Sequence, residues 1–250
     1  MSVYLGKHVV ITGANRGLGL GFVRYLLSDY PEVGRIFAGT RNPSESKELN
    51  QIAAESSKVK VIQLDVTDDQ TIEKAAELVG NEVGDEGVDL LINNAGIAIM
   101  ARNSPKEPKR DVILRVYNVN VAGTAITTAA FLPLLKKAAA KNGRKTKVLN
   151  LSSGLGSREI NKGVAANNDF AYAASKAALN MYSHILSVSD YAQHLVVLSM
   201  CPGHVKTDLG GPEAQLTIAD SIPFVLKTTA KATTEQSGQY TDRHGKIYVA

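Results

Sequence analysis

Short apolar runs alternate along the chain with longer segments in which apolar residues recur at helical spacing. The runs are nearly continuous and rich in β-branched residues, which is typical of strands buried on both faces of a parallel sheet. The segments between them have the spacing of amphipathic helices. The pattern predicts strands at residues 8–12, 35–39, 59–64, 88–92, 147–151 and 195–199, and helices that include residues 18–27, 70–79, 122–140 and 170–186.

Strand, helix and strand in this rhythm predict an α/β fold, a Rossmann-like doubly wound parallel β-sheet with helices on both faces. Thr67-Asp68-Asp69, after the third predicted strand, is typical of a helix N-cap. Polar stretches rich in Gly, Pro or Asn predict loops, and because the alternation resumes after each loop, none is expected to link two domains. The loops are 100–110, 157–169 and 207–216, and a single domain is expected over residues 1–250.

Composition narrows the possible functions. The chain has 250 residues and a net charge of +4, and aromatic residues make up 6% with no Trp, which argues against a stacking platform for single-stranded nucleic acid. The basic stretches at residues 106–110 and 136–147 are interpreted as solvated surface rather than a nucleic-acid site. A single cysteine, Cys201, argues against a disulfide scaffold and a cysteine-built zinc site, and no metal is predicted.

The N-terminal residues lack the apolar core of a signal peptide, and no apolar run is expected to cross a bilayer. We therefore expect a cytoplasmic protein with no membrane partner. The apolar helical segments around residues 122–135 and 171–186 make a homo-oligomer possible.

A glycine-rich turn follows the first predicted strand directly and opens the first predicted helix. Its residues run Thr-Gly-Ala-Asn-Arg-Gly-Leu-Gly, with the glycines at Gly13, Gly17 and Gly19. Glycines allow a tight turn and a close approach of the backbone to a pyrophosphate, whose charge the helix N-terminus favours. At the first strand–helix junction of an α/β chain this turn predicts a dinucleotide site.

Three motifs in order resemble the classical short-chain dehydrogenases/reductases over essentially all of the chain. They are the glycine turn, the Asn-Asn-Ala-Gly run at residues 93–96 and the pair Tyr172 and Lys176. Within that family the resemblance is closest to the Sniffer-type carbonyl reductases, because of the Arg-Gly-Leu-Gly-Leu-Gly run at residues 16–21 and the long gap before the tyrosine.

Tyr172 and Lys176 lie four residues apart on a predicted helix, so their side chains share one face. A neighbouring ammonium favours the phenolate and lowers the pKa of a tyrosine, which lets it transfer a proton near neutral pH. A pair of this kind on an ordinary protein surface is the alternative. The family resemblance implies that Tyr172 is the catalytic acid/base and that Lys176 tunes it and binds the nicotinamide ribose.

The resemblance implies two further catalytic residues. Ser153, at the end of the fifth predicted strand, would hydrogen-bond the substrate oxygen, and its neighbour Ser152 is the competing candidate. Asn120 matches a helical asparagine that anchors a water beside the lysine, with an ordinary hydrogen-bonded helical Asn as the alternative.

The resemblance also implies the residues that contact the cofactor. In the glycine turn they are Gly13, Asn15, Arg16, Gly17, Leu18 and Gly19; elsewhere they are Arg41, Asp65, Val66, Asn94, Ala95, Gly96, Tyr172, Lys176, Pro202, Gly203, Val205 and Thr207. Asn93 and Asn94 could instead serve the fold first. Of the other side chains near these motifs, His204 is interpreted as a bystander and Cys201 as a small buried hydrophobe.

The end of the second predicted strand predicts NADP(H) as the cofactor. Thr40 stands where an acidic residue would bind the ribose hydroxyls of NAD, and Arg41 follows it. With Arg16, Arg41 offers two guanidinium groups to a 2′-phosphate. We therefore expect NADPH-dependent reduction of an aldehyde, ketone or quinone, with a small-molecule carbonyl substrate. The alternatives are a dehydrogenase for one specific alcohol and a non-catalytic protein that senses NADP(H).

Overall fold

The computed structural model describes residues 4–99, 104–161 and 170–250. The strands are β1 (His8–Ile11), β2 (Arg35–Thr40), β3 (Val59–Gln63), β4 (Leu90–Asn93), β5 (Thr146–Leu151), β6 (Leu195–Cys201), β7 (Tyr240–Asp242) and β8 (Ile247–Tyr248). The α-helices are α1 (Gly17–Asp29), α2 (Lys47–Glu55), α3 (Asp69–Val83), α4 (Arg110–Tyr117), α5 (Thr124–Asn142), α6 (Phe170–Ser187) and α7 (Ile222–Lys231).

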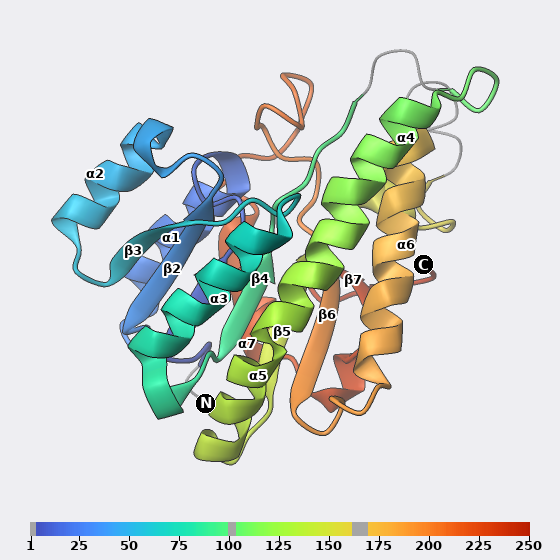
Figure 1. The fold of residues 1–250 in the computed structure, drawn as a ribbon. Coiled ribbons are helices and arrows are strands. Elements are labelled where there is room, and N and C mark those ends of the chain that lie inside the picture. The colour runs from blue at the N-terminus through green and yellow to red at the C-terminus, as the bar shows by residue number, and fades with distance from the viewer. Residues whose placement is uncertain (1–3, 100–103, 162–169) are drawn as a thin grey trace.

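The strands form one sheet in the order β3-β2-β1-β4-β5-β6-β7-β8 (Figure 1). Every pairing from β3 to β7 is parallel, and only the short β8 pairs antiparallel with β7. The chain runs outward from β1 to β3 and then returns to place β4 on the other side of β1. This reversal of strand order beside β1 is where open α/β sheets bind their ligands.

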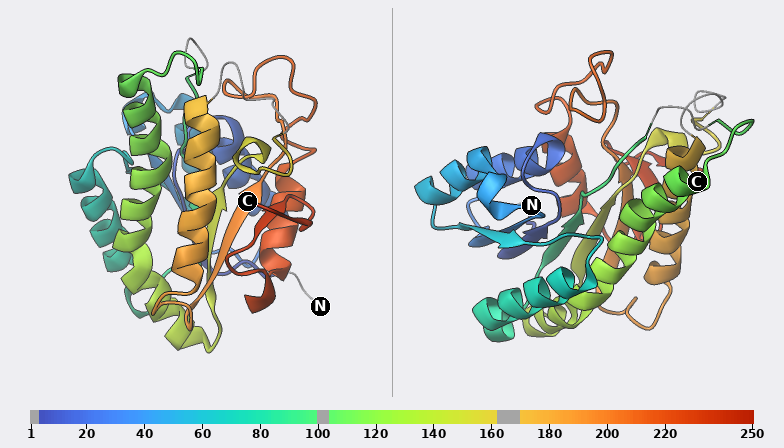
Figure 2. Two further views of the ribbon diagram at one scale, coloured as in Figure 1. Left: turned by 90° about the vertical axis from the view of Figure 1, so that its right-hand side faces the viewer. Right: turned by 45° about the horizontal axis from the view of Figure 1, so that its top comes forward.

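Helices cover both faces of the sheet, and Figure 2 shows the layers from two sides. Alternate residues of β1 point to opposite faces: Val9 and Ile11 lie in a core with residues of α1 and α7, whereas Val10 lies in a second core with residues of α3 and α5. All three of these side chains are fully buried. The strands are therefore apolar at nearly every position, as the sequence pattern predicted.

The predicted strands and helices are confirmed with shifts of a few residues at their ends. The predicted N-cap is also confirmed: the Asp68 carboxylate accepts hydrogen bonds from the backbone N–H groups of Gln70 and Thr71 at 3.0 and 3.4 Å. This cap begins α3 one residue before the predicted helix start. The doubly wound α/β fold is confirmed as well.

Several elements were not predicted because their sequence signal is short or mixed. α2 has a single buried residue, Leu49, so it carries no clear apolar stripe. β7 and β8 have only three and two residues. A π-helical segment, Asn118–Gly123, precedes α5. It was not predicted because its close contact is with a distant part of the chain: a Cβ on Gly123 would lie 2.4 Å from the carbonyl oxygen of Val66.

The long helix Arg110–Asn142, which joins α4, the π-helical segment and α5, corrects one expectation. By length and composition it could cross a bilayer, contrary to the prediction that no such run exists. Its α5 part buries Phe131 and Leu135 in the core beside α3. The core helix of a globular protein can therefore have the length and composition of a membrane span.

Lys109 and Ser104 belong to the loop before this helix. Residues 100–103 and 162–169, which belong to two predicted loops, lie outside the described residues.

Candidate active site

The carboxyl ends of β1, β4, β5 and β6 meet at one edge of the sheet, at the top of Figure 1. Because the four strands are parallel neighbours, the segments that follow them are brought side by side. These segments are the glycine turn, residues 93–96, residues 152–156 and residues 201–207. The sequence motifs therefore lie together at one edge of the sheet, although they are spread over most of the chain.

The glycine turn has the geometry that its residues predicted. Gly13 and Gly17 have φ values of +64° and +53°, a backbone region that favours glycine. A Cβ on Gly19 would lie 2.1 Å from the carbonyl oxygen of Gly13, so only glycine lets α1 begin this close to the turn. α1 has neither a side-chain cap nor an acidic residue in its first turn. Its N-terminus is thus suited to a phosphate group.

Asn94 braces the glycine turn from β4. Its Nδ2 donates hydrogen bonds to the carbonyl oxygens of Thr12 and Gly13 at 2.9 and 3.0 Å, and the hydroxyl oxygen of Thr12 accepts from the backbone N–H groups of Asn94 and Ala95. Asn93 is buried, and its Nδ2 donates to Thr128 and Asn150. Both asparagines therefore have structural contacts, and Asn94 and Ala95 also lie at the glycine turn.

Lys176 is buried in α6 and faces the end of β5. Its Nζ donates a hydrogen bond of 2.7 Å to the carbonyl oxygen of Leu151 and lies 5.6 Å from the centroid of the Tyr172 ring. Burial lowers the pKa of Lys176 to about 8, while the nearby Cys201 opposes the shift. The side chain is thus a cation at neutral pH, next to the ring of the half-buried Tyr172.

Asn120 and Gly96 lie beside this lysine. Asn120 is fully buried in the π-helical segment; its Oδ1 accepts from the N–H of Ile97, and its Nδ2 donates to the carbonyl of Ile97 and to the hydroxyl of Ser175, each at 2.9 Å. A Cβ on Gly96 would lie 3.3 Å from Asn120 Oδ1 and 3.5 Å from Lys176 Nζ. The absent side chain at Gly96 leaves a narrow space against both residues.

The two neighbouring serines occupy different environments. The Ser152 hydroxyl is buried and donates a 2.6 Å hydrogen bond to Asn180 Oδ1. Ser153 is half-buried, and its Oγ accepts from the N–H of Leu155 at 3.2 Å, which leaves its own hydroxyl proton free of that bond. The surroundings of the pair therefore favour Ser153 as the serine that meets a ligand.

The segment after β6 reaches across to the glycine turn. A Cβ on Gly17 would lie 3.4 Å from Thr207 Cγ2, so Thr207 and the start of α1 are neighbours. Gly203 has a φ of +90°, and Pro202 and Val205 are buried. His204 is exposed, and its ring Nε2 lies 2.8 Å from the nearby carbonyl oxygen of Gly210.

Cys201 corrects another expectation. It is half-buried rather than a fully buried hydrophobe, and its Sγ accepts hydrogen bonds from the N–H groups of Gly154 and Gly203 at 3.2 and 3.4 Å. The sulfur therefore joins the loop that follows Ser153 to the Pro-Gly turn. The sequence carried no signal for this contact, because the two glycines are far apart along the chain.

The two predicted cofactor arginines lie at the same edge of the sheet. The turn and the end of β2 are joined by a 2.9 Å hydrogen bond from Ala14 N to Gly39 O, and Arg41 is exposed just beyond this point. Arg16 is also exposed, and its Nη1 lies 2.6 Å from a carboxylate oxygen of Asp208. Thr40 is buried and bonded to Ser46, so no carboxylate stands at the end of β2.

Asp65 and Val66 follow β3 at this edge, two strands from β1. The Asp65 carboxylate accepts from the N–H and hydroxyl of Thr67 at 2.9 and 2.8 Å, and Val66 is buried against Gly123. The structure thus places this predicted pair beside the predicted site, although the Asp65 carboxylate is bonded locally.

The sequence missed two residues that hold the site together. Ser175 accepts from Asn120 and donates to the carbonyl of Tyr172 at 2.7 Å, so it ties the π-helical segment to α6. Asn180 accepts 2.6 Å hydrogen bonds from Ser152 and Ser199 and donates to Gly156. Polar residues on the apolar face of a predicted helix were the available signal for both.

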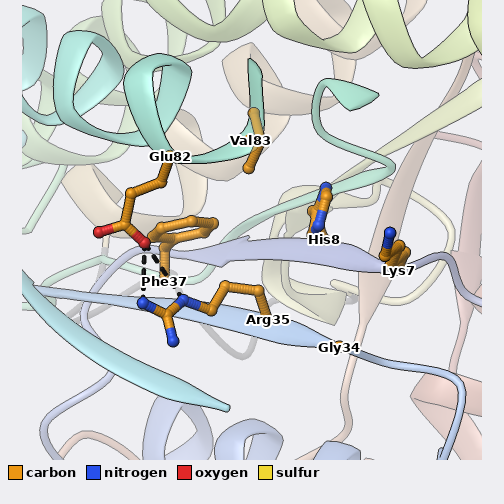
Figure 3. Close-up of a pocket in the computed structure, with 7 residues that line it drawn as sticks. All are labelled: Lys7, His8, Gly34, Arg35, Phe37, Glu82 and Val83. Atoms are coloured by element: carbon orange, nitrogen blue, oxygen red, sulfur yellow. Dashed lines mark hydrogen bonds and ion pairs between the residues drawn. The ribbon is translucent and has the colours of Figure 1, made fainter. Parts of the chain in front are cut away.

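A hollow of about 290 Å³ lies away from these residues, at the amino ends of β1 and β2 (Figure 3). Arg35 reaches along its wall to Glu82, to which its Nη2 donates at 2.8 Å, and Lys7 pairs with Glu86 at 3.6 Å. The charges of this hollow are paired within the protein. Among the described residues no group of three or more His, Cys, Asp or Glu side chains could hold a metal ion.

Known proteins resemble this chain over almost its whole length. Residues 7–216 match the short chain dehydrogenase family model. An NADPH-bound carbonyl reductase from chicken fatty liver superimposes with a TM-score of 0.92 and 34% identity, covering 99% of this chain and 100% of that one. The carbonyl reductase Sniffer of D. melanogaster has a TM-score of 0.91 and 32% identity, covering 98% and 100%.

A curated relative gives the same result. A short-chain dehydrogenase of Penicillium roqueforti is 30% identical over 243 residues, which is 94% of this chain and 93% of the relative. The family model covers well over half of the chain, and the two superpositions cover 99% and 98% of it. The chain therefore belongs to the short-chain dehydrogenase family of oxidoreductases, and it resembles the Sniffer-type carbonyl reductases.

Proposed function

We propose that this oxidoreductase is an NADPH-dependent carbonyl reductase that reduces an aldehyde, ketone or quinone. The observation that carries the proposal is the position of Lys176: a buried ammonium 5.6 Å from the centroid of the Tyr172 ring and beside Gly96 and Asn120. A cation here favours loss of the phenol proton, and the surrounding protein screens it little. We propose that this edge of the sheet is the catalytic centre.

The chain has the features that a nicotinamide dinucleotide requires. The uncapped N-terminus of α1 would hold the pyrophosphate, and the turn at Gly13 and Gly17 allows its close approach. Asn94, Ala95 and Gly96 would border the nicotinamide half, with the loop 202–207 on the other side. When bound, the cofactor supplies a hydride to the substrate carbonyl.

Tyr172 is proposed as the proton donor to the substrate oxygen. Lys176 lowers the cost of the phenolate that remains. The carbonyl of Leu151 and the burial of α6 hold the ammonium in place. Asn120 would hold a water beside Lys176, through which the tyrosine recovers its proton, because its amide is fixed by Ile97 and Ser175.

Ser153 is proposed to hydrogen-bond the substrate oxygen as negative charge develops on it. A donor aimed at a developing oxyanion contributes more in a partly dry site than in water. Ser152 is unsuited to this work because its hydroxyl is already committed to Asn180. Asn180 also donates to the carbonyl of Gly156, in the segment that follows Ser153.

NADPH is proposed over NADH because two exposed guanidinium groups, Arg16 and Arg41, stand at this edge, and the last residue of β2 is Thr40 rather than an acidic residue. Arg41 is available at this edge. Arg16 is paired with Asp208, so its share of a 2′-phosphate would require the ion pair to open or to widen. Exposed pairs of this kind contribute only about 0–1 kcal/mol, so a phosphate can compete for the arginine.

The carbonyl substrate class rests on the relatives, which are carbonyl reductases in chicken and in D. melanogaster. The half-buried Ser153 and Tyr172 border the site from the substrate side, and neither is an ionic receptor. We also propose that residues 1–250 work as a single domain in the cytoplasm, where the free Cys201 suits a reducing compartment. The exposed apolar side chains Met181 and Ile185 on α6 keep a homo-oligomer as a proposal.

A substrate panel followed by NADPH absorbance tests the function. Aldehydes, ketones and quinones are compared with NADPH and with NADH, using the wild type, Tyr172→Phe and Tyr182→Phe. Tyr182 lies on the same helix, half-buried and hydrogen-bonded to Thr128, and serves as the matched control. We expect Tyr172→Phe to lower kcat by about 10³-fold or more, whereas NADPH binding stays within about threefold.

Four outcomes would contradict the proposal. Reduction by Tyr172→Phe at the wild-type rate would remove the tyrosine from the mechanism. Equal or better use of NADH would remove the cofactor preference. Tight NADPH binding with no turnover on any carbonyl would favour the non-catalytic sensor, and oxidation of a single alcohol alone would favour a specific dehydrogenase.

A further inference from the structure

A second lysine with a partly buried side chain lies at the opposite edge of the sheet. Lys147 is the second residue of β5, and with Arg144 and Lys145 it lines a cavity of about 240 Å³. Tyr4, Leu5, Gly6, Asp89, Thr146 and Ala230 complete the lining. The cavity is formed where the N-terminal segment, the start of β5 and the end of α7 meet, at the lower edge of the sheet in Figure 1.

The charges of this cavity are unbalanced. Asp89 is its one acidic residue, and neutral donors occupy it: the N–H groups of Lys7 and His8 bond to Oδ2 at 2.8 and 3.0 Å, and Asn142 bonds to Oδ1 at 2.9 Å. The three basic side chains form no ion pair with any residue that the structure describes. The cavity therefore attracts an anion.

Each basic side chain is held in place. The Arg144 guanidinium carbon lies 3.7 Å from the centroid of the Tyr4 ring, which supports the planar cation on one face. Lys145 Nζ donates to the carbonyl of Ala192 at 2.7 Å, and Lys147 Nζ donates to the carbonyl of Ala230 at 2.6 Å. Stacked guanidinium groups are well suited to phosphate oxygens, because their donors form a rigid fork.

The amine of Lys147 is also more easily deprotonated than that of an ordinary lysine. Burial, together with repulsion from Arg144, lowers the pKa of Lys147 to about 8. At pH 8 about half of such amines are neutral, against less than about 1% for an unperturbed lysine. Only the neutral amine has a free lone pair, so Lys147 combines an anion-attracting cavity with a nucleophile.

We propose that Lys147 is an acylation site for small anionic acyl donors of the acyl phosphate class. The cationic cavity would hold the phosphate group near Arg144, which places the acyl carbon beside the amine. The geometry thus supplies both recruitment and attack. This inference is independent of the proposed carbonyl reduction, since the cavity lies at the amino ends of the strands and the site of Tyr172 at their carboxyl ends.

The chemical step balances without any further reagent. The lone pair of Lys147 Nζ attacks the acyl carbon and forms a C–N bond. The bond from the acyl carbon to the phosphate oxygen breaks, inorganic phosphate leaves with the electron pair, and the nitrogen loses one proton to solvent. The product is a neutral amide, which removes one positive charge from the cavity and changes the amine that binds the last turn of α7 at Ala230.

The hollow of Figure 3 at the same edge provides an internal comparison. It too has basic side chains, but Arg35 pairs with Glu82, which also pairs with the nearby Lys60, and Lys7 pairs with Glu86. Its cations already have carboxylate partners, so it has little unmatched charge to offer a phosphate. The two hollows differ in whether carboxylates of the protein already pair with their cations. An anion site is therefore proposed at Lys147 and not at the hollow of Figure 3.

The test compares acetylation by acetyl phosphate and by the uncharged N-acetoxysuccinimide, each followed at every lysine by peptide mass spectrometry. We expect Lys147 to react about tenfold or more faster than the exposed Lys74 and Lys227 at pH 8. Inorganic phosphate should slow the reaction with acetyl phosphate only. Arg144→Gln should lower the rate with acetyl phosphate more than the rate with the uncharged reagent.

Lys147→Arg is the matched control, because it keeps the charge and removes the acylable amine; thermal melting verifies that it folds. Reaction of Lys147 no faster than Lys74 with either reagent overturns the proposal. Fast reaction with the uncharged reagent alone overturns the assignment to anionic donors. Carbonyl reduction is assayed separately, so a failure of the proposed reductase activity leaves this test unaffected.

Discussion

Two lysines, the buried Lys176 and the half-buried Lys147, have similarly lowered pKa values but differ in what surrounds them. Each donates a short hydrogen bond to a backbone carbonyl, Leu151 at 2.7 Å and Ala230 at 2.6 Å. Burial lowers the pKa of both to about 8. Lys176 faces the ring of Tyr172 and the edge where the strands end, whereas Lys147 faces other cations at the edge where they begin.

This difference teaches that desolvation alone does not define a role. A lowered pKa lets an amine gain or lose its proton near neutral pH, and its neighbours determine which of the two forms is useful. Beside Tyr172 the charged form is the useful one, because it stabilises a phenolate. Beside Arg144 the neutral form is the useful one, because it can attack an acyl group that the cations hold.

Among the tests of this comparison between the two lysines, the largest effect is expected when each amine is removed in turn. Lys176→Met should lower kcat by about 10²-fold or more, because the phenolate loses its cation, and Lys147→Met should stay within about twofold. Steady-state kinetics with one carbonyl substrate and saturating NADPH measures both. Equal losses of kcat in the two variants would show that the different positions of the two lysines do not give them different functions.

A second prediction concerns exposed rather than buried cations. Arg41→Asp should raise the Kd for NADPH by about tenfold or more relative to that for NADH, since a guanidinium contact to phosphate is replaced by a like charge. Fluorescence titration with each cofactor measures the ratio. Lys58→Asp, another surface position with the same charge change, is the control and should leave the ratio unchanged.

The pH profile separates the charged from the neutral form of Lys176. The pKa of about 8 means that the ammonium is present below this pH and is lost above it. We expect kcat/KM for carbonyl reduction to fall above about pH 8, by up to about tenfold per pH unit. Lys147→Met should show the same profile. A flat profile to about pH 9.5 in the wild type would contradict a required ammonium.

The smallest effect is expected in the pH dependence of stability. Below pH 8 Lys147 is protonated in both the folded and the unfolded protein, so the folded state bears the full cost of a desolvated cation. Between about pH 8 and about 10.4 the folded state loses this proton while the unfolded state keeps it, so stability rises with pH.

Urea denaturation of the wild type and Lys147→Met detects this linkage. From pH 7.5 to 9.5 the free energy of unfolding of the wild type should rise by about 1–2 kcal/mol relative to the variant, after allowance for partial solvent screening. Lys176 is present in both proteins, so its own titration cancels. A constant difference over this range would show that Lys147 has an ordinary pKa.

Much of the fold and part of the site could be predicted because their signals are local. Continuous apolar runs identify strands that are buried on both faces, because Val9, Val10 and Ile11 all leave water only when both faces of the strand are covered. Gly13 and Gly17 identify a turn with positive φ. The four-residue spacing places Tyr172 and Lys176 on one face of α6 whatever the rest of the chain does.

Other features depend on contacts between distant residues, which no local pattern contains. Ser152 and Ser153 are indistinguishable until Asn180 engages one of them. From the sequence Arg16 is interpreted as a free cation, whereas in the folded protein the loop after β6 places Asp208 beside it. In the sequence Lys147 is one more charge in a basic stretch; in the folded protein α7 and the N-terminal segment shield part of it from water.

By itself the sequence determined the alternation of strands and helices, the glycine turn and the Tyr172–Lys176 pair, since backbone sterics and helical spacing act within a few residues. The tertiary structure decided which serine is free, how Asn120 is held and which lysines are desolvated. Burial and hydrogen-bond partners come from segments that meet only when the sheet is assembled. The partial burial of Lys147, at the far edge of the sheet, is a product of that assembly alone.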